Sequence, residues 1–166
     1  MTAARQQRKR YRAAAAAGLL FVLLALVALA PTARATTARI VVDWYTGLAI
    51  GGYDPVAFYT DDKPVLGSPD LEFSYGGAVW RFRNVGNRAA FAARPDVYMP
   101  QFGGYDPLGV AAGIAVAGNP QAWLIAGGRL YLFYDRGRLN TFAADAGGIV
   151  AAADRNWPTV RRSLSR

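Results

Sequence analysis

The sequence predicts an α+β fold built from two copies of one small unit, each a β-hairpin followed by a helix. The pentapeptide GGYDP stands at Gly51–Pro55 and again at Gly103–Pro107. A longer match relates Gly67–Phe82 to Gly118–Phe133, with Gly, Pro, Gly-Gly and Phe at corresponding places. The chain of 166 residues is 53% hydrophobic and 18% charged, which suits one compact domain, or two very small ones, with enough apolar surface for a core.

The first 35 residues precede this repeat and predict a targeting segment. A basic stretch, residues 5–12, comes before an unbroken apolar run, residues 13–30, and Ala33-Arg34-Ala35 fits the small-x-small rule for cleavage before Thr36. The alternative is an uncleaved membrane anchor formed by residues 13–30. In both cases the positive charge before the run directs the body out of the cytoplasm, to the periplasm or cell envelope.

The rest of the chain divides into a linker or edge segment, residues 36–50, and a domain, residues 51–166, with repeat units of about 51–102 and 103–158. The formal net charge of +8 comes mostly from the targeting segment, because the chain from Thr36 onward contains 13 cations and 11 acids. A nucleic-acid-binding domain would carry its basic patch in the folded body, so no nucleic-acid partner is expected.

Each repeat contains a predicted hairpin. The strands LEFSY, residues 71–75, and AVWRF, residues 78–82, alternate in hydrophobicity on either side of Gly76-Gly77. The same pattern recurs around Gly127-Gly128. Two consecutive glycines supply the positive φ angles that a tight hairpin turn needs.

A short helix is predicted after each hairpin, beginning at Asn84 and Asp135, which are both favourable N-cap residues. Phe91 and Phe142 stand at the same place in these helices and are predicted to be buried. The second unit is followed by a further helical segment, which we expect to be interrupted at Trp157-Pro158.

The order of these motifs resembles that of bacterial exported YHS domain-containing proteins. The resemblance is carried by GYDPVAFYTDDKPVLGSPDLEFSYGGAVWRFRNVGNRAAFAARPDVYMPQFGGY, GNPQAWLIAGGRLYLFYD and AAADRNWP, and it covers nearly all of residues 50–158. It implies a small exported domain, and in the wider group of YHS and related modules it implies metal binding through cysteines.

This chain lacks the residues for that metal chemistry, since it contains no cysteine and no histidine. The resemblance would place ligands near Ala57 and residues 83–87 in the first copy, and near Gly109 and residues 134–138 in the second. The motif GGYC of exported members reads GGYD here, with Asp106 at the last position. Thiolate binding of soft metals is therefore not expected, and we predict no metal site and no cofactor.

The repeated turn supplies the candidate ligand-binding residues Tyr53, Asp54, Tyr105 and Asp106. If the two units face one another, the two carboxylates could bind a hard cation or act as an acid and base pair. The competing interpretation is structural, because an aspartate before proline in a glycine-rich stretch typically accepts hydrogen bonds from its own turn.

The function that these observations favour is an exported YHS-like binding domain without catalytic residues, whose partner is an unknown small ligand or an envelope protein. Membrane contact is expected only through the N-terminal segment. The alternative is an envelope hydrolase, or a carboxylate-based metal-binding protein, that uses Asp54 and Asp106.

Overall fold

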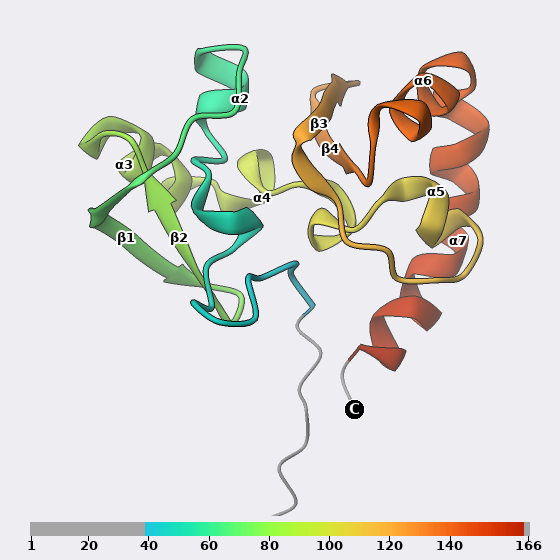
Figure 1. Cartoon of the computed structure of the whole chain (residues 1–166), viewed down its shortest axis with the longest axis horizontal. Helices are drawn as coiled ribbons and strands as arrows, with labels where there is room; N and C mark the ends of the chain where they lie inside the picture. The colour runs from blue at the N-terminus through green and yellow to red at the C-terminus, as the bar shows by residue number, and fades with distance from the viewer. Residues whose placement is uncertain (1–38, 165–166) are drawn as a thin grey trace, which may run out of the picture. The chain divides into compact units, whose positions relative to one another are not determined.

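The computed structural model describes residues 39–164 and confirms the α+β fold with two hairpin–helix units (Figure 1). The first repeat, drawn in teal and green, and the second, drawn in yellow to red, have the same order of elements. The predicted targeting segment, residues 1–35, lies outside the described residues. Among residues 39–164 no helix combines the length and the apolar character that crossing a bilayer requires.

Each repeat begins with a short 3-10 turn and a short helix, continues with two strands and ends in helices. The elements of the first repeat are η1 (Ile50–Gly52), α2 (Ala57–Thr60), β1 (Ser68–Tyr75), β2 (Ala78–Phe82), α3 (Val85–Ala93) and α4 (Pro95–Tyr98). Those of the second are η2 (Gln101–Gly104), α5 (Pro107–Ala111), β3 (Asn119–Ala126), β4 (Arg129–Phe133), α6 (Arg136–Ala144) and α7 (Ala146–Ser163).

The strands of the two hairpins are paired in the same register. Phe73 pairs with Trp80 in the first hairpin, and Leu124 pairs with Tyr131 at the equivalent place in the second. Both hairpins contain an irregularity at the same position, near the start of the first strand. The turn glycines all have positive φ, 64° and 83° at Gly76-Gly77 and 58° and 72° at Gly127-Gly128, as the sequence predicts.

The aromatic cores of the repeats are equivalent as well. Phe91 is fully buried, with its ring centroid 5.0 Å from that of Trp80. Phe142 is also fully buried, and its ring centroid lies 5.0 Å from that of Tyr131. The predicted burial of both phenylalanines is confirmed, and the hairpin of each repeat packs on its helix through this pair of rings.

The second hairpin differs from the first because β4 is buried on both faces. Leu130 and Leu132 belong to the hydrophobic core of the first repeat, whereas Tyr131 and Phe133 belong to that of the second. On β2 the residues between the core positions are only half-buried. One strand thus joins the two cores, and the alternation predicted for the second hairpin is wrong for β4, because its residues after Arg129 are buried on both faces.

The helices after the hairpins are capped as predicted. The side chain of Asn84 accepts a hydrogen bond from the backbone N–H of Asn87, at 2.7 Å. Asp135 accepts the equivalent bond from the N–H of Arg138, at 2.9 Å. Each cap satisfies a backbone donor that the first helical turn leaves without an intrahelical partner.

The expected interruption at Trp157-Pro158 is wrong, because α7 runs without a break from Ala146 to Ser163 and contains Pro158. A proline inside a helix removes one backbone hydrogen bond and normally bends or ends the helix. Here Ala153 and Val160, on either side of the proline, are buried in the second core. Packing of α7 along its length offsets the lost bond.

The described part of the predicted linker or edge segment, residues 39–50, packs against the first repeat. Ile40, Leu48 and Ala49 are buried. Isolated bridges connect Val42 with Ala49, and Leu48 with Val79 of β2. This segment therefore contributes to the first core before the first GGYDP turn begins.

Candidate functional site

The first GGYDP turn places the carboxylate of Asp54 in the interior, with no solvent exposure. Its Oδ1 accepts hydrogen bonds from the backbone N–H of Val56, at 2.8 Å, and of Ala57, at 3.3 Å. Its Oδ2 accepts from the backbone N–H of Arg83, at 2.8 Å, and from Nδ2 of Asn87, at 2.7 Å. The side chain connects the turn to the start of α3.

The second turn repeats this arrangement around Asp106, which is equally buried. Oδ1 accepts from the N–H of Leu108, at 2.8 Å, and of Gly109, at 3.0 Å. Oδ2 accepts from the N–H of Tyr134, at 2.8 Å. The fourth donor is Nη1 of Arg138, which reaches Oδ1 at 3.0 Å and forms an ion pair.

Both aspartates are thus structural acceptors within their own repeats. The turn role predicted for them is present, but each also binds a backbone donor and a side chain about thirty residues further along, which local sequence patterns do not reveal. Among residues 39–164, the hydrogen bonds to the two carboxylates come from two separate sets of donors. In the part of the chain that the structure describes, no group of three or more acidic residues is placed to hold a metal ion.

The two candidate tyrosines have different surroundings. Tyr53 is half-buried, and its hydroxyl accepts a hydrogen bond from Nε2 of Gln121, at 2.8 Å. Tyr105 is buried, with its ring centroid 6.2 Å from that of Trp157, and burial raises the pKa of its hydroxyl. The four candidate residues therefore do not line one common site.

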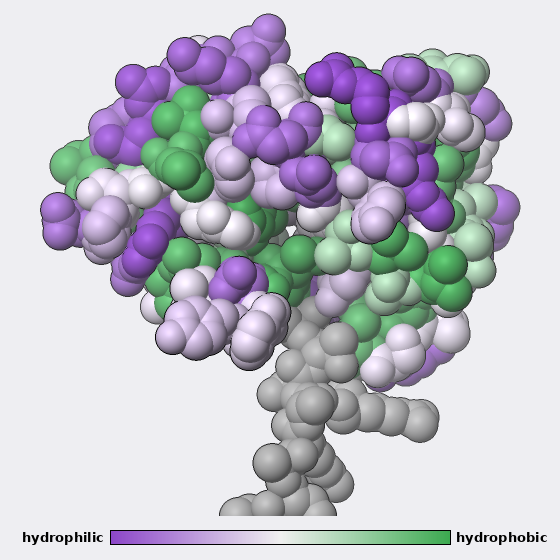
Figure 2. Space-filling view, in the orientation of Figure 1, coloured by the Kyte–Doolittle hydropathy of each residue, from purple (hydrophilic) through white to green (hydrophobic). Residues whose placement is uncertain are grey.

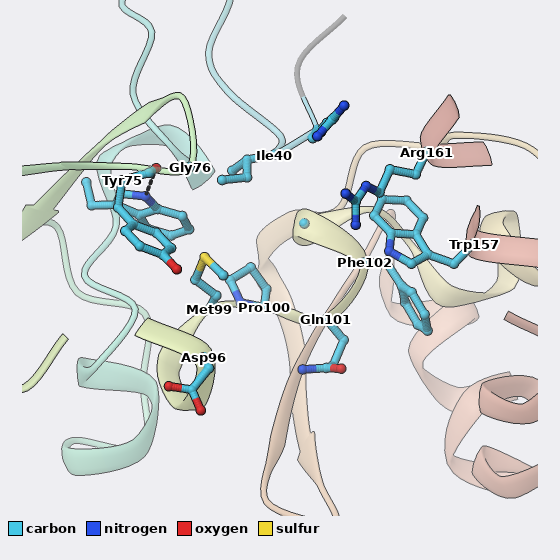
Figure 3. A pocket seen from close by; sticks show the side chains of 13 residues that line it. Ile40, Tyr75, Gly76, Asp96, Met99, Pro100, Gln101, Phe102, Trp157 and Arg161 are labelled. Carbon is cyan, nitrogen blue, oxygen red and sulfur yellow. Dashed lines mark hydrogen bonds between the residues drawn. The ribbon is translucent and has the colours of Figure 1, made fainter. Parts of the chain in front are cut away.

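A cavity of about 460 Å³ lies elsewhere, between the turn of the first hairpin, the connection between the repeats and α7 (Figure 3). Its lining residues are Arg39, Ile40, Tyr75, Gly76, Trp80, Asp96, residues 99–103, Trp157 and Arg161.

The two sides of the cavity come from different repeats. Tyr75 and Met99 stand on one side, and Trp157 and Arg161 stand on the other, with the guanidinium group of Arg161 turned toward the space between them (Figure 3). Trp80 is held on the first side by a hydrogen bond of 3.0 Å from its Nε1 to the carbonyl oxygen of Tyr75. The aromatic walls are therefore fixed by the packing of the cores behind them.

Charges of both signs border the cavity. Arg39 and Arg161 contribute two guanidinium groups, and Asp96 contributes one carboxylate. The hydrogen bonds that Arg94 donates to Asp96, both at 3.3 Å, lower the pKa of that carboxyl, so Asp96 is ionised at neutral pH. The balance of charge at the cavity is positive.

No protein-family model, curated protein or solved structure matches the chain. The cavity thus has to be interpreted from its own residues. Sequence reasoning did not find it, because its lining comes from four separate segments. The abundance of aromatic residues, 13% of the chain, is compatible with such a site but does not locate it.

Proposed function

We propose that the protein is an exported YHS-like binding domain that holds a small ligand in the cavity between the first hairpin turn and α7. The ligand would combine a flat apolar body with an anionic group. The single observation that carries this proposal is a cavity of about 460 Å³ with aromatic side chains on both sides and two guanidinium groups among its lining residues.

The size and chemistry of the cavity support binding. Small-molecule sites typically measure about 300–1,000 Å³ and combine apolar walls with a few polar groups that orient the ligand. Tyr75 and Trp157 supply aromatic surface on opposite sides of the cavity, against which an apolar body can pack (Figure 3). The guanidinium of Arg161 can donate paired hydrogen bonds to a carboxylate, sulfonate or phosphate.

The same geometry favours binding over catalysis. Asp96 is the one carboxylate among the lining residues of this cavity, so an acid and base pair is not assembled there. The oxygens of Asp54 and Asp106 already accept four hydrogen bonds each inside the protein. No observation favours the hydrolase or the carboxylate-based metal site over the binding domain.

The first experiment is a calorimetric titration of the protein with 2-naphthalenesulfonate and, separately, with the neutral 2-naphthalenemethanol. We expect the sulfonate to bind more tightly. Arg161→Ala should weaken sulfonate binding about tenfold, the effect of one hydrogen bond to a charged group, and should leave binding of the alcohol unchanged. Arg155→Ala is the matched control, because Arg155 is exposed on the same helix and does not line the cavity.

Two outcomes would contradict the proposal. In the first, neither probe binds. In the second, Arg161→Ala and Arg155→Ala weaken sulfonate binding equally, which would indicate general attraction to a basic helix. Export is tested separately by sequencing the N-terminus of protein recovered from the envelope, which should begin at Thr36 or, for an uncleaved anchor, at Met1.

A further inference from the structure

The most exposed large hydrophobic side chains in the described part of the chain form an adjacent pair. Trp44 is 91% exposed and Tyr45 is 82% exposed. Their ring centroids are 5.8 Å apart, at an interplanar angle of 74°. Single apolar residues on a surface are ordinary, but two neighbouring aromatic rings almost fully in water carry a cost that a binding surface would remove.

The turn that presents these rings, residues 43–47, is built by hydrogen bonds. Oδ1 of Asp43 accepts from the N–H of Tyr45, at 3.1 Å, and from the N–H and hydroxyl of Thr46, both at 2.8 Å. The N–H of Gly47, whose φ of 71° is positive, donates to the carbonyl oxygen of Asp43 at 2.8 Å. Trp44 and Tyr45 are thus held outward by a preformed turn.

A basic cluster lies toward the same end of the fold. Arg39, Arg161 and Arg162 line a second hollow of about 280 Å³. In Figure 1 the segment that follows Arg39 and the last turn of α7 both lie at the lower end of the view. Figure 2 shows residues of intermediate hydropathy, in pale tones, protruding where Figure 1 draws that segment.

We propose that the aromatic turn, residues 43–47, docks on the surface of an anionic phospholipid bilayer. Tryptophan and tyrosine are the side chains that favour the headgroup region, because their rings are apolar and their N–H and O–H groups remain hydrated. The arginines of the basic cluster are attracted to anionic headgroups. Arg39 and Arg161 also line the ligand cavity, whereas the aromatic turn does not.

The position of the turn in the chain favours a membrane over a protein partner. The predicted apolar run ends at Ala30, and 13 residues separate it from Trp44. Even fully extended, these residues span at most about 45 Å, so an anchored chain keeps the turn close to the bilayer that holds the run. Membrane contact would then extend beyond the N-terminal segment.

The test uses the full chain in vesicles of phosphatidylglycerol and phosphatidylcholine, with tryptophan emission quenched by brominated lipid. Quenching is measured only for the protein that floats with the vesicles. We expect quenching in the wild type and a clear loss of quenching in Trp44→Phe. Trp123→Phe removes a half-buried tryptophan of the second repeat and should leave the lipid-dependent quenching in place.

A second variant tests docking itself. Tyr45→Ser keeps Trp44 as the fluorescent reporter. Because Tyr45 is exposed, the variant should have an unchanged melting temperature. We expect its quenching by brominated lipid to be reduced at least twofold. Replacing phosphatidylglycerol by phosphatidylcholine should reduce quenching as well. The proposal is overturned if Trp44→Phe and the wild type are quenched equally, if Tyr45→Ser has no effect, or if quenching is independent of lipid charge.

Discussion

Asn87 and Arg138 are structurally equivalent, each donating a side-chain hydrogen bond, at 2.7 Å and 3.0 Å, to the buried aspartate of its own GGYDP turn. The donor is neutral in the first repeat and charged in the second. The carboxylate and its three backbone donors are common to both. The repeated pentapeptide therefore marks a preserved hydrogen-bond network in which one position has changed its charge.

Replacement of either aspartate by alanine should destabilise the protein strongly. Asp54→Ala or Asp106→Ala leaves three backbone N–H groups without their acceptor, and we expect a loss of about 3 kcal/mol in the free energy of unfolding. Urea denaturation measures the loss. Asp70→Ala, at an exposed position, should change it by less than about 0.5 kcal/mol. A loss of about 1 kcal/mol for the buried aspartates would indicate a simple turn cap.

The two central phenylalanines, Phe91 and Phe142, should contribute equally to the free energy of unfolding. Phe91→Ala and Phe142→Ala each remove a fully buried ring from the same aromatic arrangement, so each should cost about 3–5 kcal/mol. Thermal and urea unfolding of the two variants can be compared directly. Losses that differ severalfold would show that the cores are alike in geometry but not in packing energy.

Gly118 should not tolerate a side chain. A Cβ there would lie 2.6 Å from the carbonyl oxygen of Gly104 and 2.6 Å from Cβ of Leu132, closer than real contacts allow. Gly118→Ala should therefore lower the melting temperature. Gly147→Ala in α7 is the control, because a Cβ there meets no atom within 4 Å and alanine favours helix by about 1 kcal/mol. Equal shifts in both variants would contradict the close approach at Gly118.

Stability should decline at alkaline pH because of buried tyrosines. Burial raises the pKa of Tyr105 and Tyr131 above the ordinary value of 10.0. The unfolded chain then loses these protons first, so their contribution is complete below pH 10.0 and is lost as the pH rises through the folded pKa. Tyr131→Phe should make the decline shallower, whereas Tyr134→Phe, 59% exposed, should not. If the stability of the wild type and of both variants declines identically with rising pH, the buried tyrosines are not the cause of the decline.

The sequence predicted the elements that depend on neighbouring residues. The glycine turns at Gly76-Gly77 and Gly127-Gly128 and the helix caps Asn84 and Asp135 follow from local chemistry, and the structure has them in place. Repetition within the chain predicted that these elements occur twice.

What the sequence did not predict depends on distant contacts. Pro158 remains helical because α7 packs along the second core, and the carboxylate of Asp106 meets Tyr134 and Arg138 only after the hairpin has folded back. The cavity was missed for the same reason, since Tyr75 and Trp157 belong to different repeats and are more than eighty residues apart in the sequence.

The strand that is shared by the two cores also determines how the domain can open. Tyr131 and Leu132 are adjacent on β4, yet they belong to different cores. Exposure of either core by a local fluctuation would pull the strand out of the other. The two repeats are therefore coupled into one cooperative unit, and hydrogen exchange of their central amides would proceed through a single global opening.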